Sequence, residues 1–238
     1  MMHFISISNQ YILLIFFLFS VTLKAQEHDS NTAHKLYSTA LQNKHAFING
    51  REYKPYHLPL HETPYLQSVS GVGTIYMNGT AFSNKTLLYD IFKDELIVNH
   101  SHINSLQTYI QLKKSLIDSF TIAFDKKKYT LIHFKNNELG NLNAGFYEQL
   151  YHSDQVKLIF QHKAKEGKSE ALTTYSYHIN KHLVYTNKSV DINSKRKFLS
   201  LFPEHKKALK KKISQLNYSY KKLSRYQLIE LIKFTESL

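Results

Sequence analysis

Apolar and polar residues alternate in short runs along most of the chain, and tight-turn signals separate these runs. The densest example is Gly73 to Asn99. Within it, Asn78-Gly79 is the strongest hairpin signal, because a type I′ turn needs positive φ at both central residues. Asn84-Lys85 and Lys93-Asp94 are weaker candidates for two further two-residue turns. Together they predict a four-stranded meander with one apolar face, formed by Ile75, Met77, Phe82, Leu87, Tyr89, Ile91, Leu96 and Val98.

Alternation continues after the meander and predicts more antiparallel strands. They cover Leu106–Leu112, Leu116–Phe124, Tyr129–Phe134, Phe146–Tyr151, Val156–His162, Thr173–Ile179, Leu183–Thr186 and Ser189–Ile192. The polar stretch Lys163–Glu170 is typical of a mobile hairpin tip between two of these strands.

The hydrophobic period becomes helical after Ser194, which can cap a helix that runs to Phe202. Pro203 suits the start of a second helix, and Ser224 with Gln227 forms a capping box ahead of a third. Strands and helices are therefore segregated along the chain. This pattern predicts an α+β fold that is mainly β: an antiparallel meander sheet, curled or barrel-like, followed by two or three C-terminal α-helices.

The N-terminal residues resemble an export signal. The apolar run from Tyr11 to Leu23 is too short to span a bilayer comfortably, and Leu23-Lys24-Ala25 suits a cleavage site. We expect a signal peptide over residues 1–25 and no transmembrane span in the mature chain. The alternative is an uncleaved N-terminal anchor.

The rest of the chain divides into three parts. In residues 26–65 the pattern predicts a short helix, a hairpin at Asn49-Gly50 and a Pro-rich loop. We expect residues 66–193 to form the antiparallel β region. Residues 194–238 form a basic helical segment, which we expect to pack on the same domain.

Composition narrows the class of protein. The chain has 238 residues and no cysteine, so disulfides and thiol catalysis are excluded. A cysteine-free exported chain fits a bacterial protein that is secreted, periplasmic or on the outer surface. The formal net charge is +13, and residues 194–238 hold 12 Lys and Arg against 3 Glu.

Several motifs carry a resemblance to a known family. They are Gly73 with Ile75-Tyr76 and Asn78-Gly79, then Leu87-Leu88-Tyr89-Asp90, Gly145-Phe146-Tyr147-Glu148 and Lys197-Phe198-Leu199. With these motifs the chain resembles uncharacterised secreted β-rich proteins of Bacteroidota-type bacteria. The resemblance implies export and a β domain followed by helices, and it offers no catalytic residue.

Metal and cofactor chemistry find little support in the sequence. His100 and His102 would share one face of a strand, and His57 and His61 lie near Glu62 in the Pro-rich loop. A third ligand cannot be placed for either pair, whereas scattered polar histidines are common on loops. We therefore expect no metal site and no cofactor.

An enzyme is the alternative class of function. The chain lacks a Gly-x-Ser-x-Gly elbow, and His61-Glu62 lacks the second histidine of a metalloprotease. Asp90 and Glu95 are the closest carboxylate pair for an envelope hydrolase acting on a glycan. The predicted register puts Asp90 opposite Ile97 and Glu95 opposite Phe92, although a hydrated sheet edge explains this pair more simply. We assign no catalytic residue.

The charge pattern favours a binding protein. In the helix after Pro203, the basic residues Lys206, Lys207, Lys210 and Lys211 lie within one arc, opposite Leu209, Ile213 and Leu216. Such a face can bind an anionic envelope surface, an acidic polysaccharide or another envelope protein. Nucleic acid is disfavoured for an exported chain. A solvated face whose apolar side packs on the sheet explains the helix more simply, because the apolar stripe has the ordinary width of a docked helix. For the protein as a whole we predict a non-enzymatic, envelope-associated binding protein.

Overall fold

The computed structural model describes residues 50–56, 63–101, 107–125, 127–136, 138, 142–169, 172–185 and 188–238. These residues belong to one compact unit, Asn49–Leu238. The predicted signal peptide, the predicted helix after residue 26 and most of the hairpin at Asn49-Gly50 lie outside the described residues. None of the described helices is long and apolar enough to cross a membrane.

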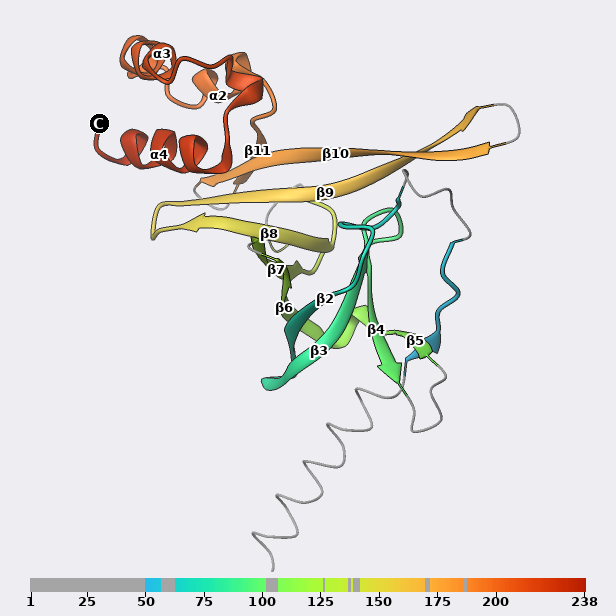
Figure 1. Cartoon of the computed structure of the whole chain (residues 1–238). Coiled ribbons are helices and arrows are strands. Elements are labelled where there is room, and N and C mark those ends of the chain that lie inside the picture. The colour runs from blue at the N-terminus through green and yellow to red at the C-terminus, as the bar shows by residue number, and fades with distance from the viewer. Residues whose placement is uncertain are drawn as a thin grey trace, which may run out of the picture. The chain divides into compact units, whose positions relative to one another are not determined.

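In the described part of the chain, eleven strands form one sheet in which every neighbouring pair is antiparallel. Figure 1 shows how these strands are arranged. The order across the sheet is β1-β5-β4-β3-β2-β6-β7-β8-β9-β10-β11. The strands are β1 (Arg51–Glu52), β2 (Gly71–Met77), β3 (Thr80–Asp90), β4 (Glu95–Ser101), β5 (Gln107–Gln111), β6 (Ile117–Phe124), β7 (Lys127–Phe134), β8 (Gly145–His152), β9 (Val156–Ser169), β10 (Leu172–Tyr185) and β11 (Lys188–Asp191). The predicted mainly β class with C-terminal helices is confirmed.

Three α-helices follow the sheet: α2 (Lys195–Ser200), α3 (Lys206–Gln215) and α4 (Arg225–Glu236). Two short 3-10 helices, η1 (Lys114–Leu116) and η2 (Tyr220–Lys222), precede β6 and α4. The Ser194 side chain accepts a hydrogen bond from the Lys197 N–H, and Ser224 with Gln227 forms the predicted capping box. These caps fix where α2 and α4 begin, because they satisfy N–H groups that have no partner within the helix.

The β2–β3 hairpin has the predicted register, with Met77 opposite Thr80 and Ile75 opposite Phe82. Asn78 and Gly79 have φ of 48° and 75°, as the type I′ turn requires.

The turn predicted at Asn84-Lys85 is wrong, because β3 continues without a break from Thr80 to Asp90. Asn84 does adopt positive φ, 54°, but it lies near the register shift where β3 passes Gly73 and Ile75 of β2. The positive φ of Asn84 therefore belongs to a β-bulge and not to the predicted turn. The stretch from Gly73 to Asn99 therefore forms the three strands β2, β3 and β4 and not the four predicted.

The β3–β4 turn is longer than predicted. Asp90 lies opposite Glu95 and Leu88 opposite Ile97, so the predicted pairing of Asp90 with Ile97 is wrong. The Asp90 carboxylate accepts hydrogen bonds from the backbone N–H groups of Phe92 and Lys93, both at 2.9 Å. These bonds stabilise a four-residue turn over a two-residue one.

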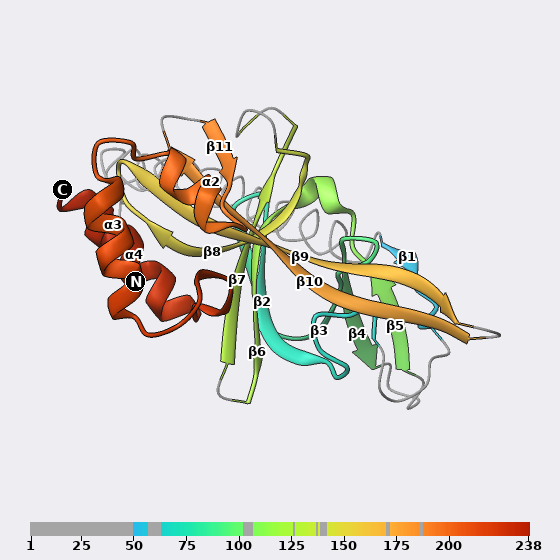
Figure 2. The same ribbon diagram turned by 90° about the horizontal axis from the view of Figure 1, so that it is seen from above.

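The stretch predicted as a hairpin tip, Lys163–Glu170, is strand up to Ser169. The predicted strands Thr173–Ile179 and Leu183–Thr186 are one strand, β10, which pairs with β9 from Leu172 to Tyr185 without a register shift. This long β9–β10 ribbon is seen from above in Figure 2. Its outer half has few strand neighbours, so polar side chains there remain in water and the strand tolerates them.

The sheet is curled but not closed, and it ends in two edge strands, β1 and β11. The curl brings the ribbon back to the β3–β4 turn, where the Ala164 N–H donates to the Ile91 carbonyl at 3.3 Å. Tyr175 of β10 also packs edge-on against Phe92 and Tyr56.

A large apolar cluster joins the helices to the sheet. Its buried members come from β9, β10, the helices and the segments that connect them: Val156, Leu158, Phe160, Leu183, Ile192, Phe198, Leu199, Leu209, Ile213, Tyr220, Leu223, Leu228, Leu231 and Ile232. The helical segment is therefore part of the same folded unit as the sheet.

Candidate functional site

Helix α3 is held in place by one apolar side. Leu209 and Ile213 are buried in the cluster beneath the helices, and Leu216 packs against it. Lys212, on the flank of the same helix, forms a 2.5 Å ion pair with Glu230 of α4. These contacts leave the opposite face of α3 in solvent.

That solvent face carries the predicted lysines. All four of the basic residues Lys206, Lys207, Lys210 and Lys211 are exposed, and none of their side chains has an ion-pair, hydrogen-bond or ring partner among the described residues. The structure thus brings these four lysines together on one helix face, which we call the α3 basic face. No carboxylate of the described residues forms an ion pair with them.

Other cations of the helical segment add to this charge. Lys195, Arg196, Lys221 and Lys222 are exposed. Of the three glutamates, Glu230 is paired with Lys212, and Glu236 accepts hydrogen bonds from Tyr151 at 2.7 Å and from Ser153. Glu204 alone has no partner among the described residues. The segment therefore presents a strongly positive surface.

A buried polar network ties α4 to the sheet. Arg225, the first residue of α4, forms a bidentate pair with the Glu148 carboxylate of β8, with 2.7 Å between Nη2 and Oε2. His162 Nε2 lies 2.8 Å from the same carboxylate, and the Tyr177 hydroxyl lies 2.6 Å from His162 Nδ1. Glu148 and His162 are 2% and 1% exposed. A carboxylate only accepts, so His162 Nε2 carries a proton toward it.

This network resembles a catalytic relay but lacks an activated nucleophile. Burial of the hydroxyl, together with Tyr129 and Glu148, raises the pKa of Tyr177, so its phenol stays protonated at neutral pH. The Arg225 guanidinium also stacks over the Tyr129 ring, 4.8 Å from its centre. We conclude that the network anchors α4 and so positions the helical segment on the sheet.

Sequence reasoning did not find this network, although one signal was present. Glu148 follows Phe146 at strand spacing, and His162 follows Leu158 and Phe160, so both polar residues continue a buried row. A polar residue on a buried row needs a partner. The partner Arg225 is 77 residues from Glu148, and only the tertiary fold brings them together.

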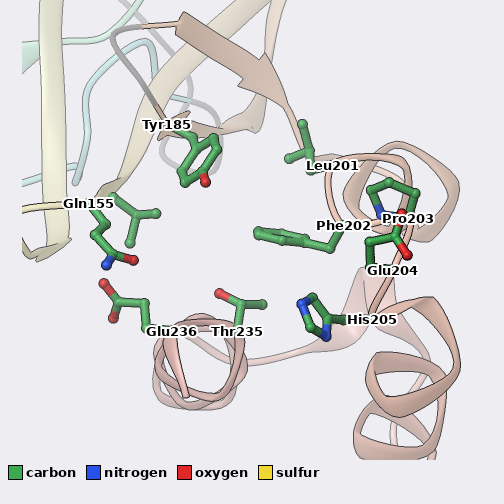
Figure 3. Close-up of a pocket in the computed structure, with 10 residues that line it drawn as sticks. Gln155, Tyr185, Leu201, Phe202, Pro203, Glu204, His205, Thr235 and Glu236 are labelled. Carbon is green, nitrogen blue, oxygen red and sulfur yellow. The ribbon is translucent and has the colours of Figure 1, made fainter. Parts of the chain in front are cut away.

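An open depression of about 230 Å³ lies between β10, the α2–α3 connection and the end of α4. Figure 3 shows its lining, in which the His205 ring and the Glu236 carboxylate lie on different sides of the space. A second depression of about 530 Å³ adjoins it and is lined by Ser153–Lys157, Val184 and Tyr185. The carboxylate of Glu236, which lines the first depression, already accepts hydrogen bonds from Tyr151 and Ser153.

The carboxylates suggested for glycan hydrolysis lie elsewhere. Asp90 is 0% exposed, and its two oxygens accept hydrogen bonds from the hydroxyls of Tyr53 and Tyr56 and from two backbone N–H groups. Glu95 lies opposite Asp90, and burial, with the nearby Asp90 charge, raises its pKa. Neither residue lines the two depressions. Asp90 stabilises the turn and is not free to meet a substrate.

The histidine pairs give no metal site in the part of the chain that is described. No group of three His, Cys, Asp or Glu there could hold a metal ion. His57, His61, Glu62 and His102 lie outside the described residues, while His100 is in β4 opposite Thr108.

Comparison of the chain with protein-family models, curated proteins and solved structures found no match. The interpretation of the site therefore depends on its own geometry.

Proposed function

We propose that the protein is an exported, non-enzymatic binding protein that holds an anionic component of the bacterial envelope on its α3 basic face. The observation that carries this proposal is the set of four exposed, unpaired lysines on a helix whose other side is buried. Clustered cations attract an anionic partner more strongly than scattered ones, because their potentials add.

Lysine suits a partner whose negative charges are distributed over an extended surface. Its ammonium is a compact charge on a flexible stem, so a row of lysines can follow phosphates or carboxylates without fixed geometry. This chemistry fits phospholipid headgroups, lipopolysaccharide or an acidic polysaccharide, and less directly another envelope protein with an acidic surface.

The test replaces Lys206, Lys207, Lys210 and Lys211 by Gln in the mature chain. A charge-matched control replaces Lys54, Lys113, Lys128 and Lys135, which are exposed residues on other elements. Each protein is sedimented with vesicles of anionic phospholipid and applied to a heparin resin at low salt. We expect the α3 variant to lose retention on at least one of the two, and the control to keep it.

The comparison separates a local site from general basicity. Equal retention of the two variants and the original protein would contradict the proposal. Equal loss in both variants would mean that only the net charge matters. Loss on vesicles alone or on heparin alone would identify the lipid or the polysaccharide as the better partner.

Export is part of the same proposal and has its own experiment. The apolar run Tyr11–Leu23 and the site at Ala25 support cleavage. Cell fractionation with N-terminal sequencing should find a chain that begins at Gln26 in the periplasm or medium. An intact N-terminus in the membrane fraction would favour an anchor instead.

The second candidate is an envelope hydrolase acting on a glycan. The observation in its favour is the depression that contains Glu204, His205 and Glu236. If it were correct, Glu236→Gln would abolish release of reducing ends from envelope glycans while leaving heparin retention unchanged. The bonds from Tyr151 and Ser153 to Glu236 favour a structural role for this carboxylate.

A further inference from the structure

One edge of the sheet is left open over a long stretch. Strand β10 pairs with β9 along its whole length, but β11 covers its outer side only from His182 to Tyr185. Among the described residues, no strand lies beside the outer side of β10 between Ser176 and Asn180. Figure 1 shows β10 running well beyond β11. We call this stretch the β10 free edge.

The direction of the backbone groups along this edge can be derived from Lys181. Its N–H donates to Asn193 Oδ1 at 2.9 Å and its carbonyl accepts from the Ile192 N–H at 2.8 Å, both on the outer side. Because these groups alternate along an antiparallel strand, Tyr177 and Ile179 present theirs outward as well. Neither has an outer backbone partner among the described residues.

The usual protections of a sheet edge are missing from this stretch. Proteins commonly protect an edge strand with lysine, proline, a bulge or short length. Residues 176–180 contain no lysine, arginine, aspartate, glutamate or proline, and the β9–β10 pairing has no register shift. The opposite edge strand, β1, has only Arg51 and Glu52 and is thus short and charged.

Charge on the neighbouring strand indicates what can bind. The outer half of β9 carries Lys163, Lys165 and Lys168 against Glu166. Lys165 lies opposite Ser176, whose side chain is small, so the lysine can reach past it toward a strand added about 10 Å away. An added strand with acidic side chains on that face would be attracted. A second copy of the ribbon would bring like charges together.

We propose that the β10 free edge is a docking site for an extended, acidic segment of a partner protein, which adds to the sheet as a further strand. Backbone hydrogen bonds would supply much of the affinity, and the lysines of β9 would select for acidic side chains. This surface is distinct from the α3 basic face.

The test uses the mature chain and a fluorescein-labelled peptide of alternating valine and glutamate, with a valine-lysine peptide of equal length as control. Fluorescence anisotropy should show saturable binding of the acidic peptide only. Absence of binding, or equal binding of both peptides, would overturn the proposal.

Two substitutions of Tyr177 separate the contribution of its backbone N–H from that of its side-chain hydroxyl. Tyr177→Phe and Tyr177→Pro both remove the hydroxyl that meets His162, but only proline removes the outward N–H. We expect binding at least about tenfold weaker for Tyr177→Pro than for Tyr177→Phe. Equal affinities would contradict the proposal. If Tyr177→Pro unfolds, Ile179→Pro compared with Ile179→Val makes the same test at the other outward N–H.

Further variants keep this inference separate from the proposed function. Lys163→Gln with Lys165→Gln should weaken peptide binding, whereas substitution of the four α3 lysines should leave it unchanged. Loss of peptide binding in the α3 variant would place the peptide on α3 and overturn the inference. Self-association that Tyr177→Pro abolishes, without peptide binding, would make a second copy the occupant instead.

Discussion

The buried carboxylates and the α3 basic face use charge in opposite ways. Asp90, Asp94 and Glu148 are the buried charged residues of the described chain apart from His162, and each has several partners. Asp94, for example, accepts a hydrogen bond from Tyr89 at 2.6 Å and pairs with Lys114. The four lysines of the α3 basic face, by contrast, are exposed, and their side chains have no ion-pair partner among the described residues.

This difference shows where the protein can bind by charge. Acids in the interior serve the fold, because an unpaired buried carboxylate would be costly. Asp94 and Glu148 are balanced within the molecule by Lys114 and Arg225. Free cations outside cost the fold little and remain available to an anionic partner.

The largest expected effect on the buried region comes from alkaline pH. The Tyr53 and Tyr89 hydroxyls donate to Asp90 and Asp94, and burial, with the nearby carboxylate, raises the pKa of both. Burial, with Asp94, raises the pKa of Tyr147 from 10.0 to about 12. The folded state thus holds protons that the unfolded state releases, so stability is complete below pH 10 and falls above it.

Circular dichroism and tyrosinate absorbance, followed together against pH, check this prediction. The two signals should change together above pH 10, because most of the buried tyrosines ionise only on unfolding. Full tyrosinate formation in a still folded chain would show that the carboxylate contacts do not stabilise the protonated phenols.

The next effect concerns the network that anchors α4. Glu148→Gln removes the charge that Arg225 and His162 share in the interior, and should lower the free energy of unfolding by about 3 kcal/mol. Glu230→Gln, which removes the exposed pair with Lys212, should cost less than about 1 kcal/mol. Urea denaturation of both variants measures the difference. Similar values would mean that burial does not distinguish the two pairs.

A smaller effect is expected at the start of α4. Ser224→Ala removes the side chain that accepts from the Gln227 N–H at 3.3 Å, and should cost about 1 kcal/mol. Ser214→Ala, at an exposed position inside α3, is the matched control and should be close to neutral. A neutral Ser224→Ala in thermal unfolding would show that α4 is held by Arg225 and its apolar side alone.

The smallest effect on stability is expected on the α3 basic face. Gln at Lys206, Lys207, Lys210 and Lys211 should change the free energy of unfolding by less than about 0.5 kcal/mol per site. Among the described residues, these side chains form no ion pair, hydrogen bond or ring contact. A large loss in urea denaturation would show that the lysines serve the fold after all.

Local signals predicted local structure well. Asn78-Gly79 and the capping box at Ser224 specify their own backbone geometry within a few residues, and both are present as predicted. Alternation found most strands for the same reason. The apolar side of α3 likewise predicted which lysines would be exposed.

Nonlocal structure could not be predicted in this way. Asn84 has the positive φ of a turn, yet pairing with β2 turns it into a bulge. The polar stretch after His162 is strand because β10 pairs with it. Glu148 and Arg225 meet only because α4 packs on β8. The local sequence pattern therefore could not predict the ion pair that anchors the helical segment.

The salt dependence of binding to anionic vesicles tests the central claim most directly. Affinities of the original protein, the α3 variant and the charge-matched control would be measured over a range of salt. We predict strong, steeply salt-dependent binding for the original and the control, and weak binding with a shallow salt dependence for the α3 variant. Identical curves for the α3 variant and the control would contradict a binding role for the α3 basic face.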